Sequence, residues 1–117
     1  MRIRVLLDEC LPVEIAGELP QHDVRTIRSM RWRGKKNGEL LQLAAANFNV
    51  FVTIDQGLAF QQRISQMRLG VVTLEAPSNE MQDLRHLMPA LRHAVLKVKP
   101  GQLIRVDSRS DSFRHKE

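Results

Sequence analysis

The sequence has few aromatic residues, and this shortage excludes two classes of nucleic-acid-binding protein. Aromatic residues make up 4% of the 117 residues, with one tryptophan and no tyrosine. Proteins that stack single-stranded bases on aromatic side chains need more of them, and so do RNA-recognition sheets with surface aromatics. We therefore expect neither class here.

Cysteine and long apolar segments are also scarce. Cys10 is the single cysteine, so the chain can form no internal disulfide and no cysteine-based zinc site. No apolar run approaches the roughly 18 residues that a membrane span needs, and the first apolar stretch is too short for a signal peptide. We therefore expect a cytoplasmic protein that contacts no membrane.

Positive charge is what the sequence has in excess. Lys and Arg total 18 against 13 acidic residues, which gives a net charge of +5. Such an excess is typical of proteins with an anionic partner, most often nucleic acid, and it also occurs as a plain solvated surface. The length fits one domain, which we place at residues 1–106, followed by a flexible polar tail at residues 107–117.

Short apolar runs alternate with segments of helical period along the chain. We expect strands at residues 2–7, 24–27, 50–54, 70–74 and 103–106 and helices at residues 12–19, 37–46 and 59–66. Asn37 would cap the second helix, and a longer helix would follow a capping box of Asn79 and Gln82 and be kinked or split by Pro89. This order predicts an α/β fold, a three-layer α/β/α sandwich with a mostly parallel sheet.

Acidic residues follow two of the predicted strands. Asp8 and Glu9 come after the first strand and Asp55 after the third, while Glu39 lies in the first turn of the preceding helix. Ligands of parallel sheets bind outside the carboxyl ends of the strands. Converging carboxylates favour Mg²⁺ or Mn²⁺, ions that support phosphodiester hydrolysis. Each acid alone is explained as well by a helix cap or a solvated side chain, so the prediction depends on convergence.

A basic segment precedes Glu39. Residues 25–36 carry the cations Arg25, Arg28, Arg31, Arg33, Lys35 and Lys36. Such a segment can bind phosphates beside a metal site, or it can be a solvated loop. We select Arg31, Arg33, Lys35 and Lys36 as RNA-contacting residues, with Lys36 nearest the scissile bond. Trp32 either stacks on a base or packs the loop against the domain.

Four segments in chain order resemble small PIN-like domain proteins. They are the opening MRIRVLLDECLP with its LLDE-x-LP pattern, then His22-Asp23-Val24, then WRGKKNGELL with its G-x-KNG-x-LL pattern, and VTIDQGLAFQQ with its T-x-D-x-x-L-x-x-QQ pattern. The matches extend over residues 1–106. The resemblance implies a compact PIN fold and a Mg²⁺- or Mn²⁺-dependent ribonuclease. It further implies RNA as substrate, an antitoxin protein as partner, and pairing into a homodimer.

The resemblance also assigns site residues by position. Asp8, Glu39 and Asp55 would be the catalytic metal-binding acids, with Glu9 as an accessory ligand. Asn37, Gln61 and Gln62 would take accessory polar roles. The family usually has one more acid shortly after the third, and this chain has Gln56, Gly57, Leu58 and Ala59 there. This departure leaves open a nuclease-inactive module with the same fold that binds nucleic acid or a protein partner.

A response-regulator-like phosphate-binding domain is a third interpretation, because such domains also gather acids at strand ends. It requires a lysine after a late strand. Lys97 and Lys99 fall instead toward the end of a predicted helix. We therefore rank this interpretation below the other two.

Overall fold

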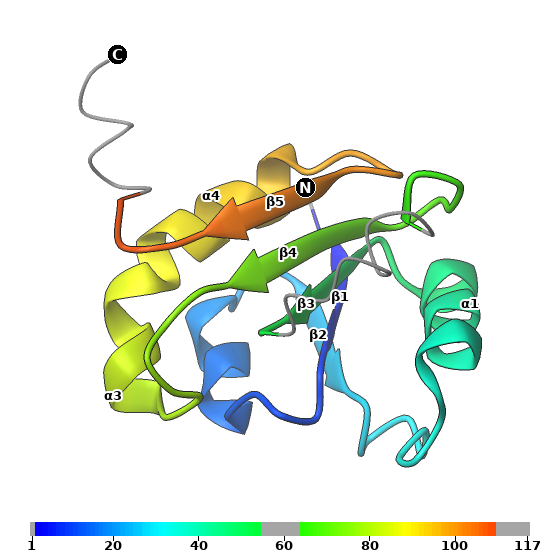
Figure 1. Ribbon diagram of the computed structural model, residues 1–117, viewed down its shortest axis with the longest axis horizontal. Helices are drawn as coiled ribbons and strands as arrows, with labels where there is room; N and C mark the ends of the chain where they lie inside the picture. Colours follow the sequence, from blue (N-terminus) through cyan, green and yellow to red (C-terminus); the bar gives the residue numbers. More distant parts are fainter. Residues whose placement is uncertain (1, 55–63, 110–117) are drawn as a thin grey trace.

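The structure is a computed structural model that describes residues 2–54 and 64–109. Strands and helices alternate along the chain (Figure 1), with η denoting a 3₁₀ helix: β1 Arg4–Leu7, η1 Val13–Glu18, β2 Asp23–Thr26, α1 Asn37–Asn47, β3 Val50–Thr53, β4 Gly70–Leu74, α3 Met81–Leu84, η2 Arg85–Leu87, α4 Met88–Lys97 and β5 Leu103–Val106. The predicted α/β class is confirmed. No helix in the described part of the chain is long and apolar enough to cross a membrane.

The five strands form one sheet in the order β2-β1-β3-β4-β5, and every neighbouring pair is parallel. Leu7 pairs with Thr26 on one side and with Val52 on the other, so β1, β2 and β3 end at the same edge. The chain leaves β1 toward β2 and later returns to the opposite side of β1 to form β3. The gap between the ends of β1 and β3 is therefore the switch point where ligands of doubly wound sheets bind.

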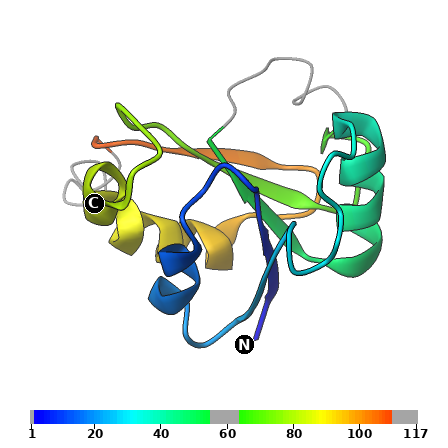
Figure 2. The same cartoon turned by 90° about the horizontal axis from the view of Figure 1, so that it is seen from below.

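The two faces of the sheet bury different residues, because successive side chains of a strand alternate between faces. One face carries Leu6, Phe51 and Val71 and packs against Leu41 and Ala44 of α1. The other face carries Leu7, Val52 and Val72 and packs against Ile15 of η1 and Leu91 of α4. Helices thus cover both faces. Figure 2 shows α1 at one side of the molecule and η1, α3 and α4 together at the other.

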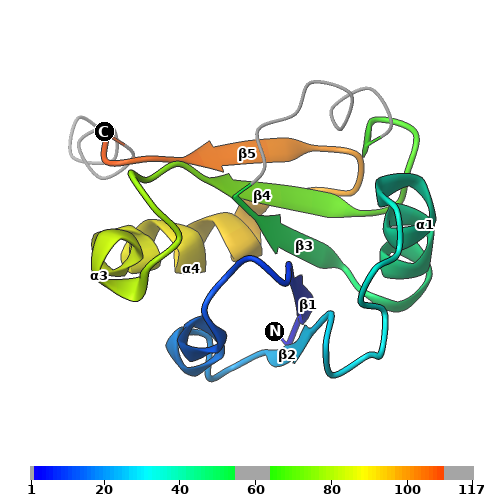
Figure 3. The ribbon, with the colours of Figure 1, turned by 60° about the horizontal axis from the view of Figure 1, so that its bottom comes forward.

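The last crossover has the opposite hand to the crossover between β2 and β3. Both connections move in the same direction across the sheet, but α1 lies on one face and α4 on the other. One of the two must therefore be left-handed, whereas nearly all parallel crossovers are right-handed. A consequence is that α4 lies beside η1 (Figure 3). Arg92 Nη1 of α4 is 3.0 Å from Glu18 Oε1 of η1.

Two predicted helix starts are wrong in detail. Lys36, with extended φ and ψ of −74° and 157°, is the N-cap of α1, and Asn37 is its first residue. The capping box of Asn79 and Gln82 does not start the later helix, because α3 begins one residue further on, with Glu80 as its N-cap. The Asn79 side chain makes a tertiary contact, in which Nδ2 donates to the Cys10 carbonyl at 2.9 Å.

Other predicted elements differ in type from the observed ones or lie outside the residues that the structure describes. Residues 12–19 were expected to form a helix, and the structure has a six-residue 3₁₀ helix there. Prolines at positions 12 and 20 limit its length, and short helices favour 3₁₀ geometry. The prediction that Pro89 splits the later helix is confirmed, since α4 begins one residue before it. Most of the helix predicted at 59–66, and the tail from residue 110, lie outside the described residues.

Candidate active site

Asp8 is the first residue after β1 and lies at the switch point. Its backbone N–H donates to the Val52 carbonyl at 2.9 Å, which extends the pairing with β3 by one residue. Its Oδ2 accepts a hydrogen bond from Thr53 Oγ1 at 2.6 Å, and its Oδ1 accepts one from the Glu9 N–H at 2.8 Å. Both carboxylate oxygens are thereby oriented, and the side chain is half-buried.

Two threonines extend this polar cluster across the sheet. Thr53 ends β3 and pairs in register with Thr73 of β4, and both are buried. Thr73 Oγ1 has no hydrogen-bond partner among residues 2–54 and 64–109, although Thr73 is 3% exposed. Native proteins pair nearly all buried polar groups. Asp8, Thr53 and Thr73 therefore form a polar row in which one hydroxyl has bonding capacity that the described fold does not use.

A cavity of about 340 Å³ lies elsewhere on the molecule, but the cavity at this edge is smaller, about 250 Å³, and more charged. It is lined by Asp8 and Glu9 at the end of β1, by Thr26 at the end of β2, and by the guanidinium-bearing residues Arg28 and Arg33, together with Leu11 and Val13. The cavity therefore places two cationic side chains beside Asp8. Guanidinium groups bind phosphates in bidentate geometry, so this arrangement can hold a phosphodiester next to a carboxylate.

The ion pair of Arg33 with Glu9 is weak. Arg33 Nε is 3.9 Å from Glu9 Oε2, and the two side chains are 63% and 51% exposed. Exposed pairs contribute little, typically under about 1 kcal/mol. Arg33 can therefore exchange Glu9 for a phosphate at small cost.

The loop after β2 is held in one conformation by its own hydrogen bonds. Thr26 and Ser29 bond reciprocally, each backbone N–H donating to the other's hydroxyl at 3.0 Å. The Trp32 N–H donates to the Ile27 carbonyl at 3.0 Å, and its ring packs edge-on against Phe48 at 6.0 Å. Of the two roles predicted for Trp32, packing is the one present. Base stacking stays a prediction.

Arg31 is the one non-glycine residue with positive φ in the described ranges, with φ 62°. The left-handed region is unfavourable for an L-residue with a long side chain. Arg31 is also exposed, so no buried contact explains its presence there. The Arg31 side chain is therefore exposed to solvent on the loop that also carries Arg28 and Arg33, which line the charged cavity.

Of the other predicted acids, Glu9 lines the cavity with Asp8, whereas Glu39 is not among the described residues that line it. Glu39 lies in the first turn of α1, where Lys35 Nζ is 3.3 Å from its Oε1, and its side chain is 61% exposed. No group of three or more His, Cys, Asp or Glu side chains in residues 2–54 and 64–109 is placed to hold a metal ion. Asp55, Gln61 and Gln62 lie outside the described residues, and Lys36 is exposed.

Cys10 and three polar residues complete the surroundings of Asp8. Burial, followed by the nearby Asp8 carboxylate, raises the pKa of the Cys10 thiol, so this cysteine is a neutral packing group.

Thr53, Thr73 and Arg28 are site residues that sequence reasoning did not select. The position of Thr53 at the end of a buried strand could have identified it. Nothing local marks Thr73.

Comparisons with known proteins give no match. No protein-family model matches the chain, and searches of curated proteins and of solved structures found no significant similarity. The structure thus defines an α/β protein with a five-stranded parallel sheet and a polar site at its switch point. The resemblance to small PIN-like proteins stays a prediction from the residues.

Proposed function

We propose that the protein is a Mg²⁺- or Mn²⁺-dependent ribonuclease of PIN type that hydrolyses RNA phosphodiesters at the switch point. The observation that supports this most is the position of Asp8, which Thr53 orients at 2.6 Å beside a cavity lined by Arg28 and Arg33. The proposal includes a role as the toxin of a cytoplasmic toxin–antitoxin pair. An antitoxin protein and a second copy of the chain are its proposed partners.

The described residues fit a hard divalent ion in part. Asp8 offers oxygen ligands of the type that Mg²⁺ prefers, and Asp55 is the proposed second ligand because it follows Thr53 by two positions. Glu9 would have to exchange Arg33 for the ion, and Glu39 would have to exchange Lys35. A bound ion would act as a Lewis acid toward the phosphate and lower the pKa of water.

The side chains of this chain have separate tasks in the proposed reaction. Thr53 holds the Asp8 carboxylate in one orientation, which a preorganised site requires. Arg28 and Arg33 bind the phosphate and balance its charge. Arg31 and Lys35 contact the RNA backbone away from the reacting bond, and Lys36 contacts it nearest the scissile bond, which steers the substrate without reading its sequence.

Cleavage of labelled RNA tests this function with a matched pair of variants. Asp8→Asn removes the carboxylate at the switch point, whereas Asp23→Asn removes one at the start of β2, where Asp23 pairs with Arg25 at 3.0 Å. We expect wild type and Asp23→Asn to cleave with Mg²⁺ or Mn²⁺ and to stop with EDTA. Asp8→Asn should be inactive. Equal cleavage by Asp8→Asn and wild type would overturn the proposal.

A nuclease-inactive RNA-binding module is the second candidate. The position of Glu39 favours it, because this acid is paired with Lys35 at 3.3 Å and does not line the cavity with Asp8. Such a module would bind RNA with the same affinity in EDTA and in Mg²⁺, and Asp8→Asn would not change that affinity. Filter binding in both conditions distinguishes it from the nuclease.

A further inference from the structure

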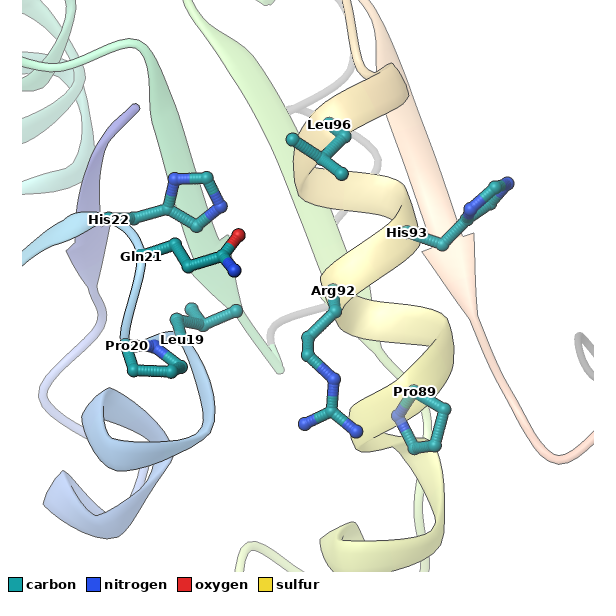
Figure 4. A pocket seen from close by; sticks show the side chains of 8 residues that line it. All are labelled: Leu19, Pro20, Gln21, His22, Pro89, Arg92, His93 and Leu96. Carbon is teal, nitrogen blue, oxygen red and sulfur yellow. The ribbon is translucent and has the colours of Figure 1, made fainter. Parts of the chain in front are cut away.

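A second cavity lies far from Asp8 along the strands. It has a volume of about 340 Å³ and is formed by the loop that precedes β2 and by one side of α4. Figure 4 shows that Gln21 and His22 extend from this loop toward α4, and that Arg92 extends from α4 along the gap. Since β2 begins at Asp23 and ends at Thr26, the cavity is at the amino end of β2 and Asp8 is at the carboxyl end of the sheet.

Half of the residues that line this cavity are apolar. Leu19 is buried beneath it, and Pro20 and Pro89 line the two sides. Leu96 closes one end and is 57% exposed, which makes it one of two large hydrophobic side chains exposed in the described part of the chain. A ligand with an apolar body would remove this leucine from water, which is favourable.

Two polar side chains of the cavity, Arg92 and His22, can donate hydrogen bonds to a ligand. Arg92 donates from one nitrogen, Nη1, to Glu18 Oε1 at 3.0 Å and to the Glu18 carbonyl at 3.3 Å, so its remaining N–H groups are available to a ligand. The Ile3 N–H donates to His22 Nδ1 at 3.1 Å. Burial lowers the pKa of His22, so the ring is neutral and carries its proton on Nε2. His22 therefore offers an N–H as well.

The charge of this cavity distinguishes it from its neighbours. Among the described residues that line it, none is acidic, and Arg92 carries the positive charge. Three other cavities, one at Asp8, one that includes Glu80 and one that includes Asp23, are each lined by at least one carboxylate. Apolar walls with a few convergent polar groups are typical of small-molecule sites, and about 340 Å³ is near the lower end of their usual volumes.

We propose that this cavity binds a small organic carboxylate with a compact apolar body. The apolar body would lie between Leu96 and the two prolines, and the carboxylate would accept hydrogen bonds from Arg92 and from Nε2 of His22. The site does not share residues with the proposed nuclease site, so it is a candidate effector site. Its existence does not depend on RNA hydrolysis.

Titration of the ¹⁵N-labelled protein with sodium benzoate tests the proposal, with benzamide as the neutral probe of the same shape. We expect saturable amide shifts for residues 20–22 and 92–96 with benzoate and at least tenfold weaker binding of benzamide, because a hydrogen bond to a charged group contributes about a factor of ten or more. Asp8→Asn should bind benzoate like wild type. That result would separate this site from the nuclease site.

Two variants of the ion pair between Arg92 and Glu18 distinguish the effect of the positive charge from the effect of breaking the contact. Arg92→Gln and Glu18→Gln both remove the contact of 3.0 Å between η1 and α4, but only Arg92→Gln removes the positive charge. Arg92→Gln should weaken benzoate binding about tenfold, while Glu18→Gln should leave it unchanged or tighter. Equal weakening by both variants would overturn the proposal. So would equal binding of benzoate and benzamide, or shifts spread over Arg28 and Arg33 instead.

Discussion

Replacing Thr53 and Thr73 separately by valine should have opposite effects on stability. The two residues are partners in register on β3 and β4, and both are buried on the same face of the sheet. Each substitution exchanges a hydroxyl for a methyl group of similar size. The substitutions differ in what the hydroxyl does, since Thr53 Oγ1 donates to Asp8 at 2.6 Å and Thr73 Oγ1 has no partner in the described part of the chain.

The magnitudes follow from these two environments. A hydrogen bond to a charged group contributes about 1.5–3 kcal/mol, so Thr53→Val should lower the free energy of unfolding by about 2 kcal/mol. Burying a hydroxyl without a partner costs about 1–3 kcal/mol, so Thr73→Val should raise that free energy by about 1 kcal/mol. For a domain of this size, 1 kcal/mol shifts Tm by about 4 °C. The two variants should therefore melt on opposite sides of wild type.

Urea denaturation followed by fluorescence measures both effects in one series. Trp32 is the single tryptophan, and its packing against Phe48 makes it a reporter of the folded state. The slope of free energy against urea should be the same in all three proteins, which shows that only stability has changed. A loss of stability in Thr73→Val as large as that in Thr53→Val would refute the reasoning, because it would mean that the Thr73 hydroxyl is paired.

Three further predictions concern a histidine, a strained arginine and two glycines. Burial lowers the pKa of His22, so the unfolded chain takes up a proton at a higher pH than the folded chain does. Wild type should therefore lose stability as pH falls below about 6.5. Between pH 7.5 and 5.5, the urea midpoint should fall less for His22→Gln than for wild type. Arg31→Gly and Arg31→Ala should weaken RNA binding equally in filter assays. At φ 62° only glycine relieves backbone strain, so Arg31→Gly should be more stable than Arg31→Ala by about 1 kcal/mol. Equal stabilities of the two variants would contradict this. In calorimetry, Gly101→Ala should lose more stability than Gly34→Ala. Both glycines have φ near +80°, but only at Gly101 would the new Cβ lie 3.3 Å from the Ser65 carbonyl oxygen. The reverse order would refute this.

The strands were the most predictable part of the fold. Val50–Thr53 and Gly70–Leu74 are buried along their whole length, and such continuous apolar runs are typical of parallel strands covered on both faces. The side of the sheet that each helix covers was not predictable. The placement of α4 beside η1 depends on the hand of the last crossover, and the local sequence does not encode that hand.

One residue of the candidate site was predictable from the local sequence, but its contacts with residues distant in the chain were not. Asp8 was predicted because a strand ends immediately before it, and the structure places it at the switch point. Its contact with Thr53 joins residues 45 positions apart, and the pairing of Thr53 with Thr73 depends on strand register. Glu39 shows the limit of local reasoning. Lys35, one helical turn earlier, is its neighbour in the structure.

The central claim is that Asp8 holds a divalent metal ion at the switch point, and paramagnetic broadening by Mn²⁺ tests it directly. Substoichiometric Mn²⁺ added to ¹⁵N-labelled protein should first broaden the amide signals of Glu9 and Thr53, whose atoms bond to the Asp8 carboxylate. The same addition to Asp8→Asn should leave those signals sharp. Broadening centred on Glu80 instead would contradict the account. So would equal broadening of the Glu9 and Thr53 signals in wild type and in Asp8→Asn.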